Sequence, residues 1–151
     1  MVCSIRLARL CEQSTLEALQ LRASLMNEAD RENLLAHPDA VELPVAHIDA
    51  GRVFVAECDG SILGFSVVLS RDDGDAELDG LFVEPSRWRS GIGRRLLDAA
   101  AAFARAAGAS ALHVIGNPHS IGFYHICGFE LLGETETRFG TGLIMRKDLY
   151  P

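Results

Sequence analysis

The segment from Val83 to Leu97, V-E-P-S-R-W-R-S-G-I-G-R-R-L-L, constrains the fold more than any other part of the sequence. It joins an apolar run, Leu81-Phe82-Val83, to a helical pattern in which apolar residues recur at spacings of three and four as far as Ala107. A strand, a glycine-rich turn and a helix therefore follow one another directly. The first turn of such a helix has unpaired N–H groups and the positive end of the helix dipole.

This turn is suited to binding an anion. Gly91 and Gly93 have no side chains to shield the backbone N–H groups, so an anion can approach the backbone closely. A dinucleotide fingerprint needs a third glycine where Leu96 stands, and a P-loop string does not occur. We interpret the turn as a phosphate site, with a plain helix N-terminus and solvated arginines as the alternative. The arginines within its nine residues are Arg87, Arg89, Arg94 and Arg95.

Composition narrows the class of protein. With 151 residues the chain is long enough for one domain, residues 1–151, with a substantial core. The net charge of −7 argues against nucleic-acid binding and favours cationic substrates such as amines. The four cysteines, Cys3, Cys11, Cys58 and Cys127, form neither a zinc pattern nor a C-x-x-C pair, so we expect reduced thiols and no metal. No leader or membrane-spanning run is evident, which favours a cytoplasmic protein without membrane contact.

Hydrophobic periodicity and turn signals predict a mixed α/β chain with a hairpin-rich N-terminal half. Asp59-Gly60 is expected to be a two-residue hairpin turn, and Gly64 a bulge or a point of close packing. The last two strands are expected to be joined by a polar loop, Glu134–Gly140. The predicted strands are Ser4–Leu10, Arg52–Cys58, Ser61–Ser70, Ala76–Val83, Ala111–Ile115, Phe129–Gly133 and Thr141–Leu149.

The helices have recognisable ends. Ser14 with Glu17 predicts a capping box and a helix to about Ala29, followed by a short helix, Asp30–Ala36. The stretch Pro38–Ile48 is expected to be irregular. Three further signals are Gly108 as the end of the helix after the phosphate turn, Asn117 with Pro118 as the start of another helix, and Gly128 as its end.

Two motifs together resemble the GNAT superfamily of N-acetyltransferases. Gly91-Ile92-Gly93 fit the glycine part of the acetyl-CoA motif [RQ]-x-x-G-x-[GA], while Trp88 stands where the family usually has Arg or Gln. The second motif, N-x-x-A-x-x-F-Y-x-x-x-G-F, is matched by the segment Asn117–Phe129, with Ser120 in place of Ala. The two motifs occur in the family's order and spacing.

The resemblance implies a mostly antiparallel central sheet of about seven strands, flanked by helices and splayed at the acetyl-CoA cleft. It also implies that backbone groups of Leu81 and Val83 bond the pantetheine arm and that N–H groups of the turn hold the pyrophosphate. The cofactor-binding residues predicted on this basis are Leu81, Phe82, Val83, Arg87, Arg89, Ser90, Gly91, Ile92, Gly93, Arg94, Arg95, Asn117, Phe123 and Tyr124.

Acetyl transfer from a thioester to an amine needs a proton acceptor, donors for the oxyanion and a proton donor for the departing thiolate. Tyr124 stands at the family's general-acid position; the alternative is a core aromatic. Glu77 and Asp79 lie at i and i+2 of one predicted strand and so share a face, which makes them candidate bases or solvated carboxylates. The histidines are interpreted as structural or surface residues, although His119 could touch CoA; they are His113, His119 and His125.

The sequence therefore predicts an acetyl-CoA-dependent N-acetyltransferase that acts directly on a primary amine of a small molecule, peptide N-terminus or lysine. The acidic stretch Glu28–Glu42 and the loop Glu134–Gly140 are expected to border the amine's entrance. A non-catalytic acyl-CoA sensor and a structural or partner-binding domain are the alternatives. We expect a monomer or homodimer.

Overall fold

The computed structural model describes residues 2–138 and 140–150, which form two compact units. The first unit comprises the chain up to residue 67 together with residues 80–99. The second comprises residues 68–79 together with the chain from residue 100 onward.

Within the described residues, seven strands form one sheet in the order β1-β2-β3-β4-β5-β7-β6. β4 pairs with β5 in parallel, whereas the pairs β1–β2, β2–β3, β5–β7 and β6–β7 are antiparallel. The mixed, mostly antiparallel sheet confirms the predicted fold class. The strands are β1 (Cys3–Leu7), β2 (Val53–Cys58), β3 (Ser61–Ser70), β4 (Ala76–Val83), β5 (Ala111–Gly116), β6 (Glu130–Thr137) and β7 (Gly140–Asp148).

The helices depart from the predicted pattern near the N-terminus. The predicted capping box at Ser14 is wrong, because the helix begins at Gln13 and the Glu17 carboxylate instead accepts the Leu43 N–H at 2.8 Å. The stretch Pro38–Ile48 is not irregular throughout, since it contains a 3₁₀ turn and the start of a short helix. The helices are α1 (Gln13–Ser24), α2 (Glu28–Ala36), α3 (Val45–Asp49), α4 (Ile92–Ala106) and α5 (Ile121–Ile126), and the 3₁₀ turns are η1 (Leu10–Glu12), η2 (Pro38–Ala40), η3 (Pro85–Arg87) and η4 (Pro118–Ser120).

None of the helices in residues 2–138 and 140–150 combines the length and the apolar composition that crossing a membrane requires. Two predicted helix ends are confirmed by their backbone. Gly108 follows α4 at φ 95° and Gly128 follows α5 at φ 94°, left-handed conformations in which glycine is favoured.

The first unit contains the antiparallel strands β1 and β2, β3 as far as Val67, and the first half of α4. Asp59 and Gly60 both have positive φ, 50° and 83°, which confirms the tight turn between β2 and β3. The β2–β3 register shifts between Ala56 and Glu57, opposite Gly64. A Cβ on Gly64 would lie 2.9 Å from the Leu96 Cδ1 atom, so this glycine lets α4 approach β3 closely. Both readings of Gly64 are therefore confirmed.

The prediction of four reduced thiols is wrong for two of them, because Cys3 and Cys58 form a disulfide. Their Cα atoms lie 4.0 Å apart, because the antiparallel register of β1 and β2 places Cys3 directly opposite Cys58. Cys58 is buried, and Cys11 is exposed. The cytoplasmic location, which rested partly on reduced thiols, stays a prediction.

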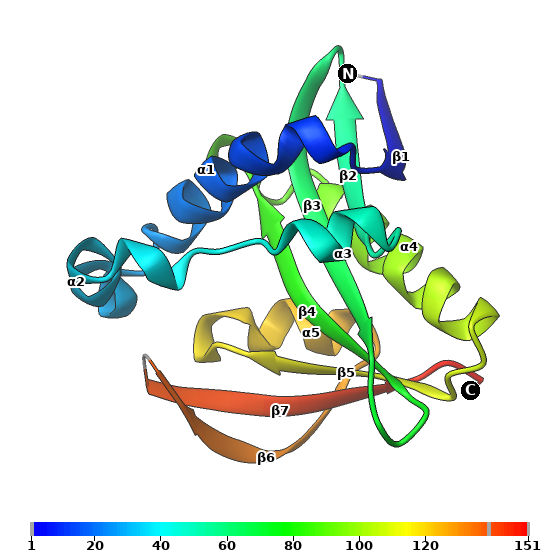
Figure 1. The fold of residues 1–151 in the computed structure, drawn as a ribbon. Helices are drawn as coiled ribbons and strands as arrows, with labels where there is room; N and C mark the ends of the chain where they lie inside the picture. The colour runs from blue at the N-terminus through cyan, green and yellow to red at the C-terminus, as the bar shows by residue number, and fades with distance from the viewer. Residues whose placement is uncertain (1, 139, 151) are drawn as a thin grey trace. The chain divides into compact units, whose positions relative to one another are not determined.

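The second unit is built on β5, β6 and β7, which Figure 1 draws in yellow, orange and red. Its parallel ladder between β4 and β5 includes Ala76 opposite Leu112 and Glu77 opposite His113. The predicted loop Glu134–Gly140 is wrong: β6 continues to Thr137, which pairs with Gly140 at the start of β7. The core of this unit contains the fully buried side chains of Leu112 and Met145.

Candidate functional site

The turn between β4 and α4 has the backbone expected of an anion site. After η3, Arg89 lies at φ 66° and Gly91 at φ 88°, so two left-handed residues precede the helix. Left-handed residues in such a turn direct successive N–H groups toward one side and form an anion-binding concavity. The first residues of α4, Ile92 and Gly93, add N–H groups that have no partner earlier in the helix. The sequence prediction and the local backbone therefore agree.

The arginines of the turn have different surroundings. All four are exposed, and they differ in whether the side chain already has a hydrogen-bond partner within the protein. The Arg95 guanidinium donates to the backbone carbonyl of Cys3 at 3.0 Å, so it links α4 to β1. The arginines better placed to bind a diphosphate are therefore Arg87, Arg89 and Arg94.

Three contacts fix the turn itself. The Ser90 hydroxyl donates to the Arg87 carbonyl at 2.5 Å. The Trp88 indole N–H donates to the Val83 carbonyl at 2.8 Å. At the start of the turn, Glu84 forms a two-pronged ion pair with Arg22 of α1, with N–O distances of 3.1 and 2.7 Å. The turn is thus tied to the strand that precedes it and to α1.

The Arg22–Glu84 pair was not found from the sequence, because nothing in the pattern connects residues 62 positions apart. The hydrogen bond from Arg22 lowers the pKa of the Glu84 carboxyl, which therefore stays ionised at neutral pH. A negative charge beside a phosphate turn would oppose an anion, and Arg22 offsets it. Arg22 is consequently part of the support of the turn.

An apolar cluster lies behind the turn. It contains Ile92 and Leu96 from α4 and Ala56 from β2, with Leu81 and Val83 packed against it. Phe82 packs against the buried ring of Phe65, with ring centroids 5.3 Å apart. The half-buried Phe82 side chain therefore contributes to the packing of this unit.

Tyr124 is a buried residue of α5 in the second unit, with 7% of its surface exposed. Its ring meets the rings of Phe123 and Phe129 edge to face, at centroid distances of 5.2 and 5.3 Å. Burial raises the pKa of the phenol above its ordinary value near 10, and Cys127 adds to the effect. The hydroxyl therefore keeps its proton at neutral pH, which is the state that a general acid needs.

The other predicted residues of the second unit have different surroundings. Glu77 is half-buried and Asp79 exposed, two residues apart on β4 and so on one face of the strand. Asn117 precedes η4 with Pro118 at its first position, as predicted, although its side chain bonds the Ser120 hydroxyl at 3.1 Å rather than a backbone N–H.

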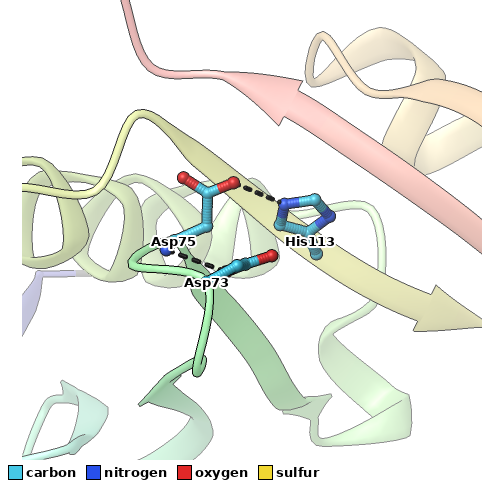
Figure 2. A group of neighbouring side chains, drawn as sticks. All are labelled: Asp73, Asp75 and His113. Carbon is cyan, nitrogen blue, oxygen red and sulfur yellow. Dashed lines mark hydrogen bonds and ion pairs between the residues drawn. The ribbon is translucent and has the colours of Figure 1, made fainter.

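Sequence analysis missed a polar cluster at the start of β4 and β5 (Figure 2). One Asp75 oxygen accepts hydrogen bonds from the Ser110 N–H and hydroxyl and from the Ala111 N–H, and the other lies 2.9 Å from His113 Nε2. The hydrogen bond with His113 is the main cause that lowers the pKa of Asp75 to about 2. Asp75 therefore joins the two strands, and His113 has a structural role, one of the two that the sequence analysis left open.

Asp73, Asp75 and His113 are also close enough to offer one ligand atom each to a metal ion. Asp73, however, forms an ion pair with Arg71 at 3.0 Å and accepts the Asp75 N–H at 3.0 Å. The cluster is thus satisfied by protein groups and is read as a structural junction.

The sequence matches the profile of the Acetyltransferase (GNAT) family over residues 20–129. This chain belongs to the GNAT acetyltransferase family. The match contains the phosphate turn and Tyr124, so the predicted enzyme class, N-acetyltransferase, and the predicted donor, acetyl-CoA, are confirmed. A search of curated proteins finds no match to the sequence.

Solved structures of acetyltransferases have the same fold as this chain. A PaiA N-acetyltransferase from Thermoplasma acidophilum in complex with coenzyme A is 20% identical, covers 98% of this chain and 99% of its own, and has a TM-score of 0.79. A GCN5-related N-acetyltransferase from Rhodopseudomonas palustris is 22% identical over 98% of each chain, with a TM-score of 0.81. YncA from Salmonella typhimurium, a putative acetyltransferase with acetyl-CoA, is 22% identical over 100% of this chain and 96% of its own, with a TM-score of 0.73.

Proposed function

We propose that this GNAT protein transfers an acetyl group directly from acetyl-CoA to a primary amine on a small molecule, a peptide N-terminus or a lysine. The observation that carries the proposal is the turn before α4, where two left-handed residues, Arg89 and Gly91, lead into the helix amid exposed arginines. In a chain with a net charge of −7, such a concentration of positive charge favours a highly charged anionic ligand. The diphosphate of acetyl-CoA has that charge.

The chemistry requires three proton transfers: the ammonium loses one proton before attack, the attacking nitrogen loses a second after attack, and the thiolate gains one as it leaves. The neutral amine attacks the thioester carbon, the N–C bond forms, and the C–S bond of the tetrahedral intermediate then breaks. Tyr124, whose buried phenol is protonated at neutral pH, would give its proton to the departing thiolate and regain one, through solvent, from the attacking nitrogen. Glu77 or Asp79 would accept the proton that the ammonium loses before attack; their shared face on β4 supports either choice. No acetyl-enzyme is needed in this sequence of steps.

The acceptor is proposed to be cationic. The acidic net charge attracts polyamines, aminoglycosides and basic peptides over long distances and repels anionic amino acids. This preference should weaken as the salt concentration rises, because salt screens the field of the protein.

The test is an acetyl-transfer screen against a panel of amines, read by the mass of the acetylated product. We expect transfer to at least one cationic amine and a lower kcat/KM for anionic amines. Binding of acetyl-CoA without transfer to any amine would contradict the enzymatic proposal and favour an acyl-CoA sensor. A preference for anionic acceptors would contradict the charge argument alone.

A further inference from the structure

Trp88 makes a contact that its position in the acetyl-CoA motif does not explain by charge. Its indole Nε1–H donates to the backbone carbonyl of Val83, the last residue of β4, at 2.8 Å. The side chain is half exposed, at 49%. The bond therefore spans η3 and links the residue after η3 to the last residue of β4.

The residue types at this position share one property. Arg and Gln, which the family usually has here, carry N–H donors on long side chains, and Trp carries a single N–H donor on a large one. Trp has no charge, so it cannot replace Arg as a partner of a phosphate. An N–H donor on a long or large side chain is the property that Trp88 shares with them, and here it bonds the carbonyl at the end of β4.

The residues that follow Trp88 depend on being held in place. Arg89 is not a glycine, yet it lies at φ 66°, a conformation that L-residues adopt at a cost and keep only where neighbours enforce it. The Trp88–Val83 bond fixes the residue directly before it, and the Ser90–Arg87 bond fixes the residue directly after it. Arg89 is thus bracketed by two local restraints.

We propose that Trp88 is a positioning residue for acetyl-CoA. Its bond to Val83 holds Arg89 and Gly91 in their left-handed conformations, and these residues in turn present the backbone N–H groups that bind the diphosphate. The inference rests on the proposed function of this turn. In this proposal Trp88 increases the affinity for acetyl-CoA by fixing the backbone of the turn, and it does not touch the reacting atoms.

The test compares two variants of opposite kind. Trp88→Phe keeps an aromatic ring and removes the donor, whereas Trp88→Gln removes the ring and keeps N–H donors. We expect Trp88→Phe to raise the KM and the calorimetric Kd for acetyl-CoA roughly fivefold, as expected for one hydrogen bond, with kcat and the KM for the amine unchanged. Trp88→Gln should stay within about twofold of wild type. Circular dichroism would confirm that both variants are folded.

A matched control is Tyr150→Phe. Tyr150 is an equally exposed aromatic residue, at 53%, whose hydroxyl donates to the Arg105 carbonyl at 3.5 Å in the other unit. Its loss of a donor should leave the acetyl-CoA KM unchanged. Trp88 is the only tryptophan in the sequence, so tryptophan fluorescence reports on this turn alone. The fluorescence of wild-type protein should change when acetyl-CoA is added, and the Kd from that titration should equal the Kd from calorimetry.

The outcomes separate this proposal from the proposed function. Wild-type protein that does not bind acetyl-CoA would overturn the assignment of the turn itself. Wild-type protein that binds, together with a Trp88→Phe variant that binds equally well, would overturn the positioning role alone. A Trp88→Gln variant weaker than Trp88→Phe would also overturn it, because the ring and not the donor would then matter.

Discussion

Replacing Cys3 and Cys58 together by alanine should lower the free energy of unfolding by about 4 kcal/mol. The two residues are 55 positions apart, and closing a chain loop of that length removes about 4 kcal/mol of conformational entropy from the unfolded state in the loop-closure account. Cys58 lies in the apolar cluster with Ile92 and Leu96, and alanine keeps its apolar character while removing one sulfur atom.

Urea unfolding with and without reductant measures this effect. The double variant and the reduced wild-type protein should unfold at similar, lower urea concentrations than the oxidised wild type. Cys11→Ala is the matched control, because Cys11 is exposed and its loss should change the stability by less than about 0.5 kcal/mol.

The same variant separates stability from ligand binding. Arg95 donates to the backbone carbonyl of Cys3, and alanine leaves that carbonyl in place. Acetyl-CoA affinity should therefore stay within about twofold of wild type. The reasoning would be refuted if wild-type protein, unfolded without reductant, exposed all four cysteines to an alkylating reagent, or if reduction left the urea midpoint unchanged.

Three further predictions concern the second unit. Tyr124→Phe keeps the ring and removes the proton, so acetyl-CoA affinity should be preserved while turnover falls on the order of 10²-fold; full activity with thiolate departure rate-limiting would contradict the acid role. Glu77→Gln should reduce the rate most at low pH, where the amine is protonated and a base is most needed, and a loss that is equal at all pH values would argue against that role. Asp75 has a folded-state pKa of about 2 against an ordinary 3.8, so it stabilises the fold above about pH 4 by about 2 kcal/mol, and this contribution is lost as the pH falls toward 2. The free energy of unfolding should accordingly fall less steeply with decreasing pH in Asp75→Asn than in wild type. The same pH dependence in both proteins would contradict the pairing with His113.

Local signals predicted the elements that surround the phosphate turn. β4 has the predicted bounds, Ala76–Val83, because its apolar run ends before Glu84-Pro85. The hairpin turn at Asp59 and Gly60 also followed from residue type, since few residues other than Gly, Asn and Asp favour positive φ. The hydrophobic pattern and the turn residues are sufficient to predict an element when the residues that determine it lie within a few positions of one another.

Long-range pairing was the part that the sequence did not reveal. The Cys3–Cys58 disulfide depends on the register of β1 against β2, and the Arg22–Glu84 pair depends on how α1 packs beside the turn. Glu17 looked like part of a capping box, but its carboxylate found a partner 26 residues away in Leu43. The β6–β7 hairpin was underestimated because glutamates and threonines in 134–137 read as a polar loop, although an outer strand can carry them.

Calorimetric titration of acetyl-CoA into wild type and Gly93→Val tests the central claim most directly. Gly93 is the second residue of α4, and a valine side chain there should restrict access to the N–H groups of the first turn. Gly133→Val, the same change at a glycine of β6 where an added Cβ would meet no atom within 4 Å, is the control. The account predicts a wild-type Kd between about 1 and 100 µM, a Gly93→Val affinity at least about tenfold weaker, and a control close to wild type. A folded Gly93→Val protein that binds acetyl-CoA as tightly as wild type would contradict the assignment of the diphosphate to this turn.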